Sequence, residues 1–337
     1  MLLGIVRDEI RMSQQNQAAI SAVLEPGSGA CRALIQKAVK SATFKQLLMP
    51  MGVPTMIEAD SEELLATASA ACPASSGEAY NTAGRIEISL TTASVPSSGM
   101  SCEITVEGSR LRLVGADFSG EADADVGTGA CSVPPRLIGD AESFAAELFD
   151  TLLLFLLARS GRTPMHAAGF LLGKTAMLLA GPSGSGKSTL ALAGAARGLP
   201  ILSDDMVFVE LEPRLRVWGL ARPIHVFPED APRHDHPVRL RNGKRKAVVN
   251  VGISSTALFA DEAVVVLLDR GHEVALNAIE PGEAVEALTR LEPGFDLLAE
   301  ATAAAAQAIA ARGAWRLTLS DNPADAIDCL LERFAQR

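Results

Sequence analysis

The spacing of apolar residues changes along this chain, and each change marks a different kind of structure. Over residues 7–72 apolar side chains recur at the spacing of one helix face, which predicts helices over 7–24 and 30–42. The polar residues at 60–63 are typical of a helix cap and first turn, so a third helix is expected to run from there through residue 71. The pattern therefore predicts an N-terminal helical region over residues 1–80.

Between residues 84 and 135 apolar and polar residues alternate instead, which is typical of half-buried strands. We expect strands at 85–90, 102–106 and 111–114. Residues 120–130 are acidic and rich in glycine and alanine, so they are expected to form a loop. This region is a β-rich accessory segment over residues 81–135.

Residues 142–160 predict one long apolar helix. Its most apolar part, 148–158, contains Asp150 and is about half the 20 residues that cross a bilayer. The helix is therefore expected to be buried in the protein, with no membrane partner.

Beyond residue 161 short apolar runs alternate with helical segments, which is the pattern of an α/β domain. Strands are expected at 176–180, 200–202, 207–210, 215–218, 247–251, 263–268 and 315–319. Helices are expected at 188–197, 283–291, 295–312 and 322–334. The third domain is therefore expected to span residues 136–337.

A phosphate-binding motif lies between the first strand and the first helix of that α/β domain. The pattern GxxxxGK[ST], the Walker A loop, is matched by Gly181, Pro182, Ser183, Gly184, Ser185, Gly186, Lys187 and Ser188. In such a loop the backbone N–H groups point at phosphate oxygens, the lysine reaches the β- and γ-phosphates, and the serine hydroxyl binds Mg²⁺. We expect these residues and the adjoining Thr189 to bind ATP with Mg²⁺.

Two further features lie at fixed distances from Lys187. Asp204 and Asp205 follow it by 17 and 18 residues, at the end of an expected strand. One carboxylate of such a pair can hold Mg²⁺ and the other can accept a proton from a hydroxyl; an ordinary turn or helix cap is the alternative. His166 precedes Lys187 by 21 residues, and a single histidine is more often a surface or core residue than a catalytic one.

Taken together, these elements resemble the HPr kinase/phosphorylase family and the related kinases that phosphorylate lasso-precursor peptides. The resemblance implies an α/β fold, a P-loop kinase core of the HPr-kinase/PEP-carboxykinase type with a mixed sheet and flanking helices, over residues 136–337. It also implies a catalytic or phosphate-contacting role for His166, with Asp205 as the base and Asp204 on the metal side beside Ser188. The chain departs from the family at Thr189, where HPr kinases usually carry glutamate, and it lacks their second signature. A peptide or small acceptor therefore fits better than HPr itself.

A basic segment at 233–246 stands where that second signature would be. It holds six cations and one opposing carboxylate, Asp235. An Asn-Gly pair at 242–243 indicates a hairpin turn, so this segment is expected to form a flap. The flap is expected to contact phosphate or an acidic acceptor through Arg239, Arg241, Lys244 and Arg245; a solvated charged hairpin is the alternative.

Composition narrows the class of protein. The chain has 337 residues with 48% apolar and 21% charged, which is ordinary globular composition. Its net charge of −10 argues against a nucleic-acid partner. The five cysteines are widely spaced with no CxxC pair, and the N-terminus does not read as a secretory signal, so we expect a cytoplasmic protein with reduced thiols.

The leading hypothesis is an ATP-dependent kinase that transfers the γ-phosphate to a hydroxyl, most directly a serine of a peptide or small protein. A small-molecule kinase with the same machinery and an ATP-hydrolysing regulatory module are the alternatives. A transporter-type ATPase is the weakest rival, because the chain has no LSGGQ-like signature. Whether the chain forms a homo-oligomer stays open.

Overall fold

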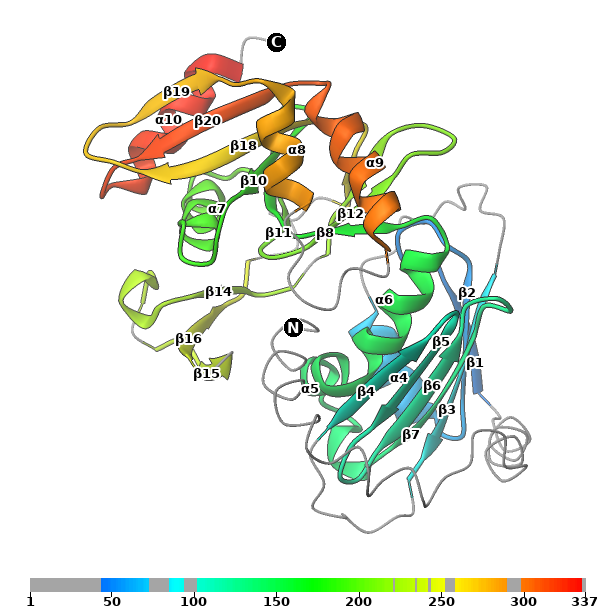
Figure 1. Ribbon diagram of the computed structural model, residues 1–337. Coiled ribbons are helices and arrows are strands. Elements are labelled where there is room, and N and C mark those ends of the chain that lie inside the picture. Colours follow the sequence, from blue (N-terminus) through cyan, green and yellow to red (C-terminus); the bar gives the residue numbers. More distant parts are fainter. Residues whose placement is uncertain are drawn as a thin grey trace, which may run out of the picture. The chain divides into compact units, whose positions relative to one another are not determined.

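The computed structural model describes residues 44–72, 85–93, 102–220, 222–233, 235–241, 244–251, 258–289 and 298–334. The chain divides into two compact units, Met1–Ser160 and Gly161–Arg337 (Figure 1). This division differs from the expected boundaries at 80 and 135. The helices expected over 7–24 and 30–42 lie outside the described residues.

The first unit is built on one seven-stranded sheet, with the order β1-β2-β3-β7-β6-β5-β4. Its strands are β1 (Phe44–Leu48), β2 (Thr55–Ala59), β3 (Ile86–Thr92), β4 (Glu103–Glu107), β5 (Arg110–Val114), β6 (Ser119–Asp123) and β7 (Thr128–Val133). Its helices are α4 (Glu62–Ala71), η1 (Pro135–Leu137), α5 (Ala141–Phe144) and α6 (Asp150–Arg159), with a π-helical turn (Ala145–Phe149) between the last two. Alternate strand residues such as Ile57, Ile88 and Leu111 are buried, so one face of the sheet forms the core.

Much of this unit agrees with the expected pattern. The three expected strands correspond to β3, β4 and β5, and α4 begins after Ser61, whose hydroxyl accepts a hydrogen bond from Leu64 N. The long helix expected over 142–160 is present as α5, the π-helical turn and α6. It belongs to the first unit, however, and not to the α/β domain to which residues 136–160 were assigned.

Two expectations about the first unit are wrong. Residues 120–130 contribute to the paired strands β6 and β7 rather than to a loop, because small residues let α6 approach the sheet: a side chain at Gly120 would lie 2.9 Å from Leu152 Cδ1. The region 1–80 is also not wholly helical, since β1 and β2 pair in antiparallel fashion within it. β2 carries the period-2 burial of a strand, but it is only five residues long.

The second unit contains a six-stranded mixed sheet with the order β11-β9-β10-β18-β20-β19. The strands are β9 (Ala168–Leu172), β10 (Thr175–Ala180), β11 (Ile201–Ser203), β18 (Glu262–Arg270), β19 (Ala275–Ala278) and β20 (Ala314–Leu319). β10, β18 and β20 are parallel, while β9 runs antiparallel to both β10 and β11. β11 therefore runs in the same direction as β10.

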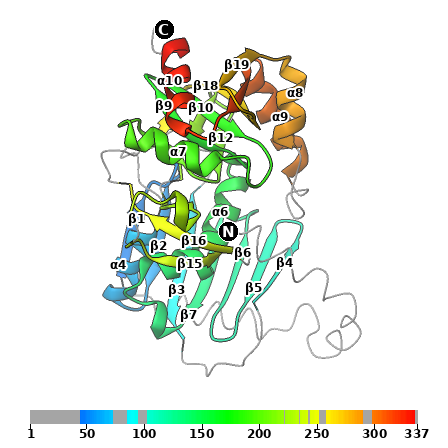
Figure 2. The ribbon, with the colours of Figure 1, turned by 90° about the vertical axis from the view of Figure 1, so that its left-hand side faces the viewer.

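Helices cover both faces of this sheet, as Figure 2 shows. On one face Met177 and Leu179 of β10 pack in a core with residues of α7 (Lys187–Ala196) and α10 (Pro323–Phe334). On the other face Leu178 packs in a core with residues of α8 (Pro281–Thr289) and α9 (Ala299–Ala310). These helices confirm the expected ones; α8 begins two residues before its expected start, and α9 has shorter bounds than expected.

Two smaller sheets complete the second unit. One has the order β17-β13-β12-β8, with β8 (Thr163–Met165), β12 (Val207–Glu210), β13 (Arg216–Trp218) and β17 (Phe259–Ala260). The other has the order β14-β16-β15, with β14 (Ile224–Val226), β15 (Val238–Arg241) and β16 (Lys244–Val249), and a 3₁₀ turn η3 (Pro228–Asp230) follows β14. The protein is thus a mixed α/β fold. None of the helices in the described ranges is long and apolar enough to cross a bilayer.

Candidate active site

The predicted site residues follow or precede strands that end at one edge of the six-stranded sheet. β10 and β11 point the same way, so the phosphate loop after Ala180 and the aspartates after Ser203 emerge at the same edge. β9 runs the opposite way, so His166, which precedes it, lies at this edge as well. The carboxyl ends of parallel strands are the usual place for ligands in α/β sheets.

The phosphate loop, residues 181–186, has a backbone that only glycines adopt readily. Gly181, Gly184 and Gly186 have φ values of 154°, 87° and 106°. A side chain at Gly181 would lie 2.8 Å from Ser185 Oγ, and one at Gly186 would lie 2.9 Å from Leu319 Cδ1. Gly186 is also the N-cap of α7 and offers no side-chain acceptor, so the first-turn amides are available to an anion.

Lys187 folds back across the loop. Its Nζ donates to Gly181 O at 2.7 Å and to Pro182 O at 3.3 Å, and the residue is 8% exposed. A buried ammonium needs such acceptors, and the oxygens of a bound phosphate would compete with these carbonyls. Ser185 Oγ is buried and has no hydrogen-bond partner in the described part of the chain, whereas Ser183 and Gly184 are exposed at the tip of the loop.

His166 and Asp205 are brought together. A hydrogen bond from Ala167 N to Met165 O closes a three-residue turn centred on His166, which separates β8 from β9. His166 Nδ1 then lies 3.6 Å from Asp205 Oδ1, and both side chains are about one-third exposed, at 31% and 35%. Asp205 therefore presents a solvent-accessible carboxylate beside an imidazole, which is the arrangement needed to orient and deprotonate a hydroxyl.

Asp204 has a different environment from its neighbour. It is 5% exposed, and its Oδ2 accepts a hydrogen bond from His225 N of β14 at 2.8 Å. His225 Nδ1 lies 3.8 Å from the same oxygen. The two aspartates thus differ in environment: Asp204 is buried and hydrogen-bonded, and Asp205 is accessible.

The residues that fit Mg²⁺ are Ser188 and Asp204. Their hydroxyl and carboxylate oxygens are the hard donors that this ion prefers, and it usually takes its remaining ligands from phosphates and water. No group of three or more His, Cys, Asp or Glu side chains suited to a metal occurs within the described ranges. A site here would accordingly depend on the nucleotide for most of its ligands.

Arg270 was missed in the sequence. It ends β18, and a side chain built at Gly186 would lie 3.3 Å from its Nη2, so the guanidinium lies against the phosphate loop. The available signal was a cation directly after an expected parallel strand at 263–268. His225 was also missed, because β14 has only three residues and no alternation long enough to detect.

The remaining predicted residues are Thr189 and the cations of the basic segment. Thr189 Oγ1 donates to Asp230 Oδ2 at 3.4 Å, which links α7 to η3. The basic segment forms a hairpin as expected, with Arg239 opposite Lys246, Leu240 opposite Arg245 and Arg241 opposite Lys244. The turn residues at 242–243 and the side chain of Arg241 are outside the described part of the chain.

No known family model matches the sequence, and no curated protein matches it either. Among solved structures the chain is similar to an Hpr(Ser) kinase/phosphatase from Coxiella burnetii, at 13% identity and a TM-score of 0.29. That likeness covers 51% of this chain and 95% of the other. At this TM-score the likeness carries no weight, so the proposals below rest on motifs and geometry.

Proposed function

We propose that the protein is a kinase that transfers the γ-phosphate of Mg·ATP to a hydroxyl group. One observation carries this proposal: the phosphate loop, the accessible Asp205 with His166, and the buried Asp204 emerge at one edge of the six-stranded sheet. Phosphoryl transfer needs a phosphate cradle, a metal-side carboxylate and a group that orients the acceptor. The residues at these strand ends offer a candidate for each of the three, which supports the proposal.

Each residue has a role that follows from its environment. The loop amides, Lys187 and the N-terminus of α7 hold the phosphates, and Arg270 offsets charge on the transferring group. Ser188 and Asp204 would hold Mg²⁺, which would supply positive charge to offset that of the phosphates. Asp205 accepts the acceptor's proton as the hydroxyl oxygen bonds to the γ-phosphorus and the bond to ADP breaks, while His166 orients the Asp205 carboxylate.

The acceptor that the sequence motifs favour is a serine in a peptide or small protein. The spacing of His166, the loop and the aspartates supports a diverged member of the HPr-kinase-related group, and the absence of the second HPr-kinase signature argues against HPr itself. A small molecule as acceptor, or water in a regulatory ATPase, would use the same phosphate cradle. These alternatives are separated by where the phosphate goes.

The test follows label from γ-labelled Mg·ATP into size-separated fractions of cell extract, with Asp205→Asn as the control variant. Label in a peptide or protein fraction that is lost in the variant is the expected result, and mass analysis then identifies the acceptor. Label only in small molecules would replace the peptide acceptor with a metabolite. Free phosphate released equally with and without extract would contradict the kinase proposal.

A further inference from the structure

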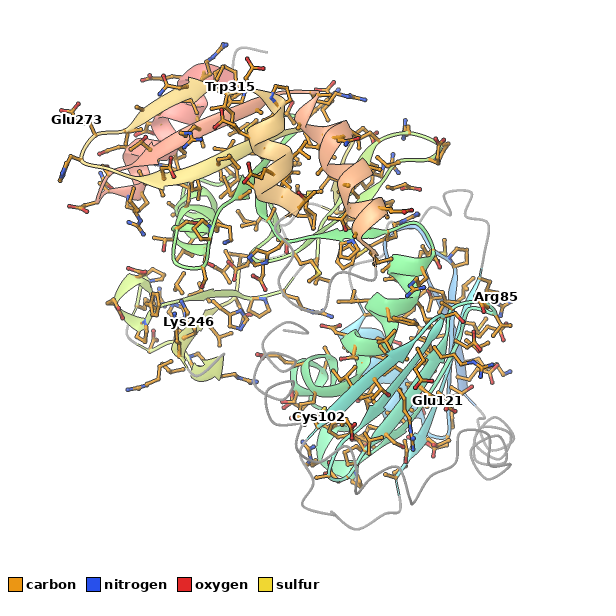
Figure 3. The ribbon with its side chains drawn as sticks, viewed as in Figure 1. Arg85, Cys102, Glu121, Lys246, Glu273 and Trp315 are labelled. Atoms are coloured by element: carbon orange, nitrogen blue, oxygen red, sulfur yellow. The ribbon has the colours of Figure 1, made fainter. Side chains whose placement is uncertain are left out.

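The three-stranded sheet β14-β16-β15 has one largely apolar face, and its other face carries cations beyond the buried Val248. Ile224, Val226, Ala247 and Val249 are buried in the same core as Phe170 and Leu190, so their face packs inward. The register places Arg239 opposite Lys246, and Lys244 lies two residues before Lys246 on β16. Because side chains alternate along a strand, these three cations share the other face, which we call the basic face. Figure 3 labels Lys246 on this sheet.

Arg239 and Lys246 lie directly opposite each other, and like charges in such a pair destabilise a hairpin. The basic face therefore costs stability, which points to a role in binding. Elsewhere in the described chain several exposed arginines and lysines form ion pairs, as at Lys45–Glu58, Arg110–Asp123 and Arg197–Asp328. Arg239 and Lys244 are exposed. In a protein of net charge −10, such a cluster is a local binding surface for anions.

A hydrogen bond from β14 links the sheet that carries the basic face to the candidate active site. His225 donates its backbone N–H to Asp204 Oδ2, and it lies opposite Val248 on β16. Lys246 and Lys244 follow at two and four residues from Val248 along β16. At about 3.4 Å per residue they lie roughly 7 and 14 Å from that position. The Lys246 ammonium is held 3.2 Å from the centre of the Phe227 ring, which fixes its place on the face.

We propose that the basic face binds carboxylates of the acceptor, a peptide segment that lies extended along it with acidic residues at every second position near the phosphorylated serine. This inference rests on the proposed function and names its substrate class. Alternate side chains of an extended peptide are about 7 Å apart, which matches the spacing of Lys244 and Lys246. With the serine placed beside His225, which lies opposite Val248, the acidic residues fall about two and four residues from it.

A peptide fits this surface better than the nucleotide does. The phosphates already have the loop amides, Lys187 and Arg270 at the ends of β10 and β18. The basic face extends along β16 away from the position that faces His225, with Lys246 and Lys244 about 7 Å apart and Arg239 beside Lys246 on β15. Lysines about 7 Å apart along a strand match carboxylates on alternate residues of an extended peptide.

The test uses the full chain and three synthetic nine-residue peptides with a central serine. The first has glutamate at positions two and four on each side, the second has glutamine there, and the third has the same four glutamates in one contiguous block. Binding is measured by fluorescence anisotropy without ATP, and transfer is measured with Mg·ATP. The variants are Arg239→Gln/Lys244→Gln and, as a matched control, Lys174→Gln, which lies in the turn before β10 at the opposite edge of the sheet.

The alternating glutamate peptide is expected to bind tightest. The double variant should weaken that binding by about fivefold to tenfold, with Lys174→Gln unchanged and the difference lost at 0.5 M salt. Equal binding of the glutamate and glutamine peptides would overturn the inference, as would a double variant that weakens only Mg·ATP binding. Binding of the alternating peptide without transfer would contradict the proposed function alone, and transfer indifferent to the glutamates would contradict this inference alone.

Discussion

At the scale of single residues, two glycines of the phosphate loop, Gly181 and Gly186, combine a positive φ with surroundings that leave little room for a side chain. Gly186 combines a φ of 106° with close contacts to the side chains of Leu319 and Arg270. Gly198, after α7, has a φ of 78° but nothing within 4 Å of an added side chain. Comparing alanine variants of Gly186 and Gly198 therefore separates the cost of backbone strain from the cost of a steric clash.

We therefore expect Gly186→Ala to lower the free energy of unfolding of the second unit by about 1–3 kcal/mol more than Gly198→Ala does. Gly186→Ala should also weaken nucleotide binding, because a φ of 106° is strained for alanine and the added methyl group would lie 3.3 Å from Arg270 Nη2. Urea unfolding followed by tryptophan fluorescence, together with ATP titration, measures both effects. An equal loss of unfolding free energy in the two variants would show that the surroundings of Gly186 can accommodate a side chain.

Arg270 gives a second prediction at this scale. Its guanidinium lies beside Gly186, where charge on a transferring phosphoryl group would be offset. Arg270→Gln is expected to lower turnover by about a hundredfold with a smaller change in ATP affinity, as when one charge-stabilising donor is removed from an active site. Steady-state kinetics beside Lys174→Gln check it. Unchanged turnover would remove Arg270 from the site.

The sequence predicted the residues that carry a motif and missed those that depend on topology. The loop, His166 and the aspartates stand at recognisable spacings, and the structure pairs His166 with Asp205. Arg270 reaches the loop only because β18 pairs with β10 and β20, and His225 reaches Asp204 only because β14 pairs with β16. Long-range pairing of this kind leaves no local signature.

At the scale of elements, polar links tie the irregular segments of the first unit together. Arg136 of η1 donates to both carboxylate oxygens of Asp117, at 2.6 and 2.9 Å, and also pairs with Glu147 of the π-helical turn at 2.8 Å. The hydrogen bonds from Arg136 lower the pKa of Asp117 below its ordinary value. Strand β6 is thereby held to the segment that leads into α6.

This link should give a pH-dependent stability. A carboxyl whose pKa is lowered by folding stabilises the protein above its unfolded pKa of about 4, and that stabilisation is lost as the pH falls through the folded pKa. Asp117→Asn should therefore lower local stability by about 1 kcal/mol at pH 7, and the difference from wild type should fade below about pH 4. Amide hydrogen exchange of β5 and β6, corrected for intrinsic rates, measures this.

The matched control is Asp123→Asn, which breaks the more exposed pair with Arg110 on the neighbouring strand. It should cost less, because the Arg110 side chain is 75% exposed and water screens the pair. A pH-independent effect of Asp117→Asn would show that Asp117 acts by packing rather than by charge.

Element types were predictable where the apolar pattern was long and regular. β3, β5 and β10 alternate or run apolar as strands should, and α10 starts at the expected Asn-Pro pair. β6 and β7 were missed because their small residues, such as Gly120, suit a sheet only where α6 packs closely on it. β1 and β2 were missed because short strands are stabilised by their partners rather than by their own residues.

At the scale of the whole molecule, each unit has its own buried core and contains a residue that can report its unfolding. Both tryptophans, Trp218 of β13 and Trp315 of β20, lie in the second unit. Cys131 of β7 is buried in the first unit, and burial raises the pKa of its thiol well above the ordinary value. Tryptophan fluorescence thus reports unfolding of the second unit, and labelling of Cys131, mapped by mass, reports unfolding of the first.

Mg·ATP at about one hundred times its dissociation constant should stabilise the second unit by about 2.7 kcal/mol. The urea midpoint from tryptophan fluorescence should rise by the corresponding amount, while the midpoint from Cys131 labelling stays where it was. Lys187→Ala, which removes the bonds to Gly181 and Pro182, should abolish the rise. A parallel rise in both midpoints would show that the two units unfold together.

The central claim is that one sheet edge holds the phosphates, the metal-side carboxylate and the acceptor base around a single γ-phosphate. The most direct measurement is a crystal structure with Mg²⁺ and a non-hydrolysable ATP analogue. We predict that the γ-phosphate contacts Lys187 and Arg270 and that Mg²⁺ binds Ser188 and Asp204. We also predict that the Asp205 carboxylate lies close enough to the γ-phosphorus for a single acceptor hydroxyl to fit between them. An analogue bound elsewhere, or Asp205 more than about 10 Å from the Lys187 ammonium, would contradict the claim on reach alone.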